Sequence, residues 1–269
     1  MTGTAIEALF RRGDVVVVAA LIALMLLAWL ALLGGAGTGM NPFAMSTWRW
    51  PAALPPEPMT AWSLSYWLIA FFMWAVMMVA MMLPGASPMV LLYARVVRQA
   101  EAHGGALHAR VAIAAFASGY LTIWILFSAL AVCLQWGLER VGAMSAMMSI
   151  SPTLLSGGVS IAAGLYQLTR IKRTCLAHCR GPAAFLAAHW RPGLSGAFCM
   201  GLAHGTYCLA CCAVLMLLLF VGGVMNLVWI AGLTLIVAVE KLAPFGAGAA
   251  TATGAILIAG GCALVLAGP

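Results

Sequence analysis

Residues 204–212 read HGTYCLACC and place one histidine and three cysteines in a stretch that is otherwise apolar. In an α-helix, His204, Cys208 and Cys211 follow the spacing i, i+4, i+7 and share one face, which Cys212 borders. Imidazole and thiolate are strong ligands for soft or borderline metals such as Cu(I) and Zn(II). Packing is the alternative for each thiol, because cysteine is readily buried as a small hydrophobe. The histidine favours a functional site, since ionisable groups within apolar spans are costly.

A second group of soft ligands lies upstream, in the sequence CLAHCR at 175–180. Cys175, His178 and Cys179 have the spacing i, i+3, i+4 and share a face if the segment is helical. The same segment is basic, so the alternative interpretation is a juxtamembrane helix attracted to anionic lipid. Metal contact and lipid contact both remain open for this group.

The third group is a run of methionines in MWAVMMVAMMLP, residues 73–84. At helical spacing they form two parallel lines: Met73, Met77 and Met81, and Met78 and Met82. A thioether is a soft ligand that suits Cu(I) and needs no deprotonation. Methionine is also a flexible filler of apolar cores, so the lines predict either a thioether shelf beside a metal site or ordinary packing.

The composition places all three groups in a membrane protein. Of 269 residues, 65% are hydrophobic and only 7% are charged, whereas soluble domains carry about 25% charged residues. Crossing a bilayer takes about 20 apolar residues, and irregular backbone is not viable in lipid, so the apolar runs predict helices. Seven spans are predicted, at residues 15–33, 66–83, 111–134, 154–169, 196–221, 226–242 and 252–268. We therefore expect an all-α polytopic bundle, with residues 1–269 as a single integral membrane domain.

The basic residues predict the orientation of this bundle. A cytoplasmic N-terminus leaves two of them outside, Arg49 and Arg140. It leaves eleven inside: Arg11, Arg12, Arg95, Arg98, Arg110, Arg170, Lys172, Arg173, Arg180, Arg191 and Lys241. This distribution follows the positive-inside rule. It explains the net charge of +7 without any nucleic-acid partner.

Three connections stand out between the predicted spans, and the prolines of the outside one predict an irregular cap. These connections comprise a proline-rich outside loop at 34–65 and polar inside loops at 84–110 and 170–195. Glu240 and Lys241, at the inner end of the sixth predicted span, are expected to form an interfacial pair. The sequence shows no serine–histidine–acid set, no H-E-x-x-H motif and no nucleotide-binding glycine loop, so an enzyme is not the favoured class.

Five segments occur together in an order typical of one family. They are MWAVMMVAMMLPGASPM (73–89), GYLTIW (119–124), AGLYQLTRIKRTCLAHCRGP (163–182), HGTYCLACC (204–212) and LMLLLFVGGVMNLVWIAGLTLIVAVEKL (215–242). They resemble the bacterial family of predicted metal-binding integral membrane proteins, a domain of unknown function sometimes labelled copper chaperone. The resemblance covers residues 65–245 and implies a metal-handling protein of the bacterial inner membrane.

The leading hypothesis is a membrane protein that binds a soft metal, Cu(I) before zinc, and exchanges it with a metal-donor or metal-acceptor protein. The central site would contain His204, Cys208, Cys211 and Cys212. Cys175, His178 and Cys179 would form a separate cytoplasmic contact, and the thioether shelf would contain Met77, Met78, Met81 and Met82. Two alternatives remain: a membrane thiol–disulfide relay that uses the paired cysteines, and a scaffold protein in which the cysteines only pack.

Overall fold

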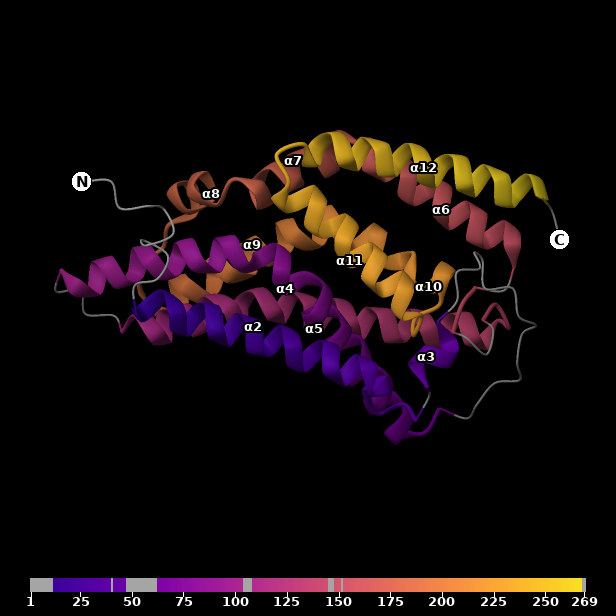
Figure 1. The fold of residues 1–269 in the computed structure, drawn as a ribbon, viewed down its shortest axis with the longest axis horizontal. Coiled ribbons are helices and arrows are strands. Elements are labelled where there is room, and N and C mark those ends of the chain that lie inside the picture. Colours follow the sequence, from indigo (N-terminus) through magenta and orange to yellow (C-terminus); the bar gives the residue numbers. More distant parts are fainter. Residues whose placement is uncertain are drawn as a thin grey trace.

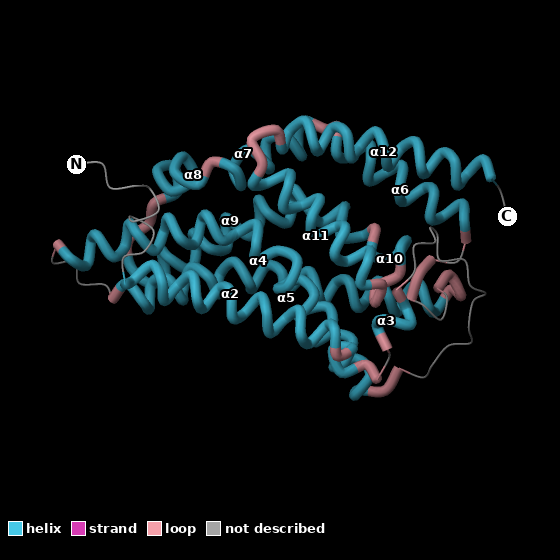
Figure 2. The backbone as a smooth tube through the Cα atoms, viewed as in Figure 1, coloured by secondary structure: helices cyan, strands magenta, loops and turns pink. Residues whose placement is uncertain are grey.

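The computed structural model describes residues 12–39, 41–46, 62–103, 108–144, 148–150 and 152–267, with side chains from residue 15 onward in the first range. Throughout these ranges the chain is built from helices joined by short turns (Figure 2), and no strand is present in them. The elements are α2 (Arg12–Leu33), η1 (Gly35–Gly37), α3 (Pro42–Met45), α4 (Leu64–Ala102), α5 (Ala109–Arg140), α6 (Thr153–Gln167), α7 (Arg170–Arg180), α8 (Pro182–His189), α9 (Gly193–Leu217), α10 (Leu219–Gly222), α11 (Leu227–Leu242) and α12 (Gly246–Ala267). The expectation of an all-α fold is confirmed for the described residues.

Each of the seven predicted spans falls on a helix, but the helices differ in length. Within the described ranges, five segments are long and apolar enough to cross a membrane: Val15–Leu33, Leu64–Ala102, Ala109–Arg140, Gly193–Gly222 and Gly246–Ala267. The other two predicted spans fall on α6 and α11, which have 15 and 16 residues. These helices are shorter than the roughly 20 residues that a crossing needs.

The predicted inside loop at 84–110 is mostly helical, because α4 continues through Pro84 and Pro88 to Ala102. With 39 residues and a rise of 1.5 Å each, α4 is about 58 Å long. Proline cannot donate a hydrogen bond to the carbonyl four residues earlier. At Pro88 the Ser87 hydroxyl compensates by donating to the Pro84 carbonyl oxygen at 2.7 Å. The helix therefore continues for 19 residues beyond residue 83, where the predicted span ends.

Helices α5 and α9 pack closely because small residues face each other at their crossing. A Cβ on Gly119 would collide with the Phe198 carbonyl oxygen, and one on Gly201 would collide with the Phe116 carbonyl oxygen. Gly205 continues this line, where a Cβ would lie 2.8 Å from Ile123. This close packing brings the 204–212 segment of α9 against the part of α5 that contains Tyr120 and Ile123.

On another flank, α6 and α12 run side by side, with α11 between this pair and the other long helices (Figure 1). Short helix α7 follows α6 after two residues and packs against both α9 and α11. Buried apolar residues from α2, α4–α7 and α9–α12 form a shared cluster that contains Cys208, Cys211 and Cys212 of α9. Much of the predicted outside loop, including Arg49, lies outside the described residues, as does Arg11 near the N-terminus.

Candidate metal centre

Four thiols from two helices meet in the core. Cys208, Cys211 and Cys212 of α9 are each 1% exposed, and Cys179 reaches them from α7. The Sγ atoms of Cys211 and Cys212 are 3.2 Å apart, and those of Cys179 and Cys211 are 3.8 Å apart. The Cys211 thiol also donates to the Cys208 carbonyl oxygen at 3.2 Å. We refer to these four residues as the thiol cluster.

The amphipathic pattern of α7 explains how Cys179 reaches the cluster. Lys172, Leu176 and Cys179 follow the spacing i, i+4, i+7 and form its buried face. The helix begins at a cap formed by Thr169, whose Oγ1 accepts a hydrogen bond from the backbone N–H of Lys172. Cys179 was expected at a separate cytoplasmic contact, but the structure places it 3.8 Å from a thiol of the central group.

A buried ion pair between Lys172 of α7 and Glu240 of α11 holds α7 beside the cluster. The Lys172 ammonium donates to Glu240 Oε2 at 2.6 Å and to the Cys211 carbonyl oxygen at 2.6 Å. The other carboxylate oxygen, Oε1, accepts a hydrogen bond from Gln167 Nε2 at 2.5 Å. Lys172 and Glu240 are 0% and 1% exposed, so their charges compensate each other away from solvent.

The second buried lysine contacts the cluster directly. The Lys241 ammonium donates to Cys208 Sγ at 2.9 Å. The Tyr120 hydroxyl lies 3.1 Å from the same sulfur and donates to the Met82 carbonyl oxygen at 3.1 Å. A Cβ on Gly85 would lie 2.7 Å from the Lys241 Cδ, so the glycine leaves room for the lysine stem beside α4.

The prediction that Glu240 and Lys241 form an interfacial pair is wrong. Both residues are buried, at 1% and 5% exposure, and each bonds to a different group. Glu240 binds Lys172, whereas Lys241 binds Cys208. Because they are consecutive on α11, their side chains point in different directions around the helix.

His204 lies one turn before Cys208 and is enclosed by aromatic rings. Its ring stacks with those of Phe116 and Tyr120 at centroid distances of 6.3 and 5.6 Å, and the ring of Phe185 lies edge-on at 5.4 Å. The side chain is 2% exposed, and its Nδ1 has no hydrogen-bond partner among the described residues. A buried nitrogen without a partner is costly, so this atom has a free lone pair or proton to offer a ligand.

The remaining members of the 175–180 group lie at the edge of the cluster. Cys175 is half-buried and packs against the apolar core. The His178 ring stacks on Tyr207 at 4.2 Å with nearly parallel planes, and its Nδ1 lies 2.8 Å from the Thr174 carbonyl oxygen. The structure therefore separates His178 from Cys179, although the two residues are adjacent in sequence.

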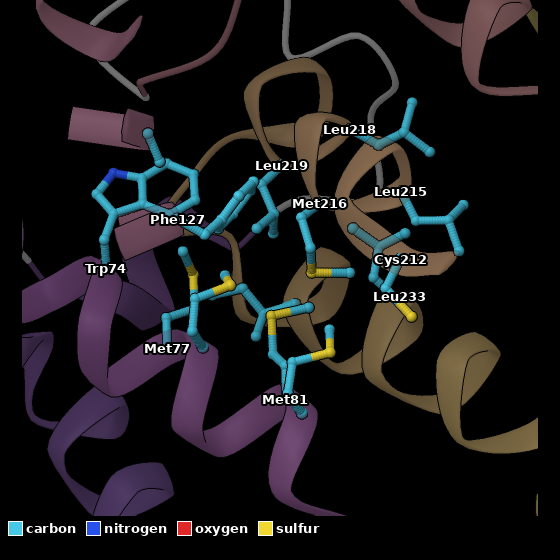
Figure 3. Packing of buried hydrophobic residues seen from close by; sticks show 14 of the residues in the cluster. Trp74, Met77, Met81, Phe127, Cys212, Leu215, Met216, Leu218, Leu219 and Leu233 are labelled. Atoms are coloured by element: carbon cyan, nitrogen blue, oxygen red, sulfur yellow. The ribbon is translucent and has the colours of Figure 1, made fainter. Parts of the chain in front are cut away.

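The methionines of α4 line the same core as the cysteines. Met77, Met78, Met81 and Met82 are all buried, with at most 1% exposure. Figure 3 shows Met77 and Met81 extending from α4 into the space that Met216 and Cys212 enter from α9. Thioethers and thiols thus share one apolar compartment.

The possible metal ligands are soft sulfur atoms, and the short distances between them join two sulfurs at a time. Within the part of the chain that the structure describes, no group of three or more His, Cys, Asp or Glu side chains is arranged to hold a metal ion. Two sulfurs that bind one ion at about 2.3 Å each lie no more than about 4.6 Å apart. The measured separations of 3.2 and 3.8 Å permit such pairs, and a two-coordinate ion needs only one pair.

Several residues of this site were not identified from the sequence: Tyr120, Gln167, Lys172, Glu240 and Lys241. Charged residues within apolar helices were the available signal, because such residues usually have a partner or a role. Lys172 also repeats with Leu176 and Cys179 on one helical face. Tyr120 and Gln167 gave no comparable signal.

Comparison with known families identifies the same region. A family model described as a copper chaperone matches residues 71–264, from the first turns of α4 to the last turns of α12. The matched range includes all four members of the thiol cluster, both buried lysines and the methionines of α4. No curated protein and no solved structure matches the chain.

Proposed function

Since this chain belongs to the copper chaperone family, whose model matches residues 71–264, we propose that it is an integral membrane protein that binds Cu(I) as its cargo. It accepts the ion from a metal-donor protein or delivers it to a metal-acceptor protein. The family description itself supports a copper-handling role. The oxidation state, the ligands and the membrane location are our proposal.

The observation that carries the proposal is the thiol cluster, which gathers four buried thiols from α7 and α9. We assign Cys179, Cys208, Cys211 and Cys212 as the thiols that supply the metal ligands, two of them for each ion, with the free Nδ1 of His204 as a further donor one turn away. The thioether shelf of Met77, Met78, Met81 and Met82 borders the same compartment. Thiolates bind both Cu(I) and Zn(II), but thioethers select Cu(I), so copper fits this combination better than zinc.

Cys175 and His178 lie outside the cluster, and we propose a role for them in transfer. Both are partly exposed on α7, next to the helix face that carries Cys179. A ligand that reaches both solvent and the core can pass an ion between a partner protein and the cluster.

The membrane arrangement that we propose is a single bundle of seven spans in the bacterial inner membrane, with the N-terminus in the cytoplasm. The five helices of crossing length support it. Each of the two shorter helices has a neighbouring helix close to it in sequence. Helix α7 begins after two residues beyond α6, and α11 begins after four residues beyond α10. The excess of basic residues in the predicted inside segments supports the orientation.

Metal analysis tests the copper assignment. The protein is purified in detergent, loaded with Cu(I) under reducing conditions and analysed for bound metal beside the variant Cys208→Ser/Cys211→Ser/Cys212→Ser. We expect about one copper per wild-type chain and a large loss in the variant. Cys133→Ser/Cys262→Ser is the matched control, because both of these cysteines are exposed, and it should bind like the wild type. A folded wild type without copper would refute the assignment.

A thiol–disulfide relay is the second candidate, favoured by the 3.2 Å contact between the sulfurs of Cys211 and Cys212. Differential alkylation with mass spectrometry distinguishes the two functions. A relay would show reversible oxidation of a specific cysteine pair, whereas a copper site would show thiols that Cu(I) protects from alkylation. A scaffold with packed cysteines would show neither behaviour.

A further inference from the structure

Lys241 places a positive charge against the thiol cluster, at Cys208. Its side chain is 5% exposed, and its ammonium donates to Cys208 Sγ at 2.9 Å. The charge comes from α11, while the thiols come from α7 and α9. The packing of three helices therefore fixes where this charge lies.

The charges around the cluster do not balance without a contribution from the thiols. Lys172 is compensated by Glu240, which it meets at 2.6 Å. The charge on Lys241 instead faces sulfur, and a buried charge is costly unless an opposite charge accompanies it. The cluster therefore meets this charge best when its thiols and any bound ion together carry one negative charge.

We propose that Lys241 is the resident countercharge of the metal site and makes the site prefer a univalent soft cation held by two thiolates. This inference rests on the proposed function and adds a reason for the choice of ion. Two thiolates and one Cu(I) carry a net charge of −1, which Lys241 neutralises. Lys241 is thus a specificity-determining residue that acts through the charge of the complex.

A divalent ion does not meet the same condition with two thiolates. Two thiolates and one Zn(II) form a neutral unit and leave the Lys241 charge uncompensated. A third thiolate would restore the balance but would require another ionised thiol in an apolar core. The ammonium therefore favours Cu(I) over Zn(II) at this site, and the same argument applies to Ag(I).

The test compares Lys241→Met with Lys241→Arg in the full-length protein in detergent. Apparent affinities for Cu(I) and Zn(II) are measured by competition with chelators under reducing conditions. We expect Lys241→Met to lower the Cu(I) affinity at least tenfold and to reduce the preference for Cu(I) over Zn(II). Lys241→Arg keeps the charge and should retain the preference. Helix content is checked for each variant, and Lys241→Gln replaces Lys241→Met if that variant does not fold.

The outcomes separate this inference from the function on which it rests. Unchanged Cu(I) affinity in a folded Lys241→Met protein would overturn the inference and leave the copper function intact. Equal losses of Cu(I) and Zn(II) affinity would also overturn it, because they would indicate a merely structural lysine. If the wild type bound no Cu(I), the proposed function would fail, and this inference with it.

Discussion

Cys179 differs from the other thiols of the cluster because it belongs to another helix. Its sulfur lies 3.8 Å from that of Cys211, which is close enough for both to bind one ion. Cys175 is one turn earlier on the same helix and only half-buried. The two cysteines of α7 are thus a natural pair for comparison, with the same chemistry and different positions.

We predict that Cys179→Ser lowers the apparent Cu(I) affinity by about tenfold or more, because loss of a ligand should cost at least as much as loss of a residue that supports one. Cys175→Ser should change the affinity by less than about threefold, since this residue lies at the edge of the core. Competition with a Cu(I) chelator measures both. Equal effects of the two substitutions would contradict the position that we assign to Cys179.

At the scale of elements, α7 depends on a buried ion pair. Lys172 connects α7 to Glu240 of α11 and to the backbone of α9 at Cys211. Arg180, at the other end of α7, donates to the Glu240 carbonyl oxygen at 2.6 Å. These contacts connect α7, α9 and α11 next to the thiol cluster.

Removing one partner of a buried ion pair leaves an uncompensated charge, so we predict that Lys172→Met lowers the free energy of unfolding by about 3–5 kcal/mol. The double variant Lys172→Met/Glu240→Gln should lose less, because it leaves no isolated charge. Unfolding in mixed detergent micelles measures these differences.

Glu101→Gln is the control for this prediction. It removes the carboxylate of an exposed contact with His108, which should cost no more than about 1 kcal/mol. If Lys172→Met had a similarly small effect, the ion pair would not hold α7 in place.

The apolar runs were sufficient to locate the long helices. They did not indicate α7 and α8, which lie in the predicted polar loop at 170–195. They were also not sufficient to show where α4 ends. A proline within a helix normally interrupts it, as Pro84 and Pro88 would be expected to do. The hydroxyl that compensates at Pro88 belongs to Ser87, and a serine before a proline is not a distinctive sequence pattern. Loops were therefore predicted where the helix continues.

The candidate site was predictable only in part. The spacing of His204, Cys208 and Cys211 identifies a shared face of one helix from sequence alone. Cys179 and Cys211 are 32 residues apart in sequence, and Lys172 and Glu240 are 68 residues apart. Both contacts depend on how separate helices pack against each other. Local spacing in the sequence does not encode such contacts.

At the scale of the whole molecule, the thiol cluster lies inside a set of apolar helices, away from the protein surface. Side chains of α5, α7, α9 and α11 make its contacts, and the methionines of α4 border it. In the function that we propose, this burial would limit release of the ion, which suits transfer to a partner rather than free exchange with water. The orientation of the bundle decides which compartment the partner occupies.

We predict a cytoplasmic connection between α11 and α12 and an external C-terminus. A reporter enzyme that is active only in the cytoplasm should be active when inserted after Pro244 and inactive when fused after Pro269. A reporter active only outside the cytoplasm should show the opposite pattern. Activity of the cytoplasmic reporter at both positions would contradict an odd number of spans with a cytoplasmic N-terminus.

The central claim is that buried sulfur atoms hold Cu(I). The most direct measurement is X-ray absorption at the copper edge of the wild-type protein, loaded with one equivalent of Cu(I) under reducing conditions. We predict a first coordination shell dominated by sulfur, with two short thiolate bonds, and a changed shell in Cys179→Ser/Cys211→Ser. A shell of nitrogen and oxygen, or a spectrum unaffected by these substitutions, would contradict the account.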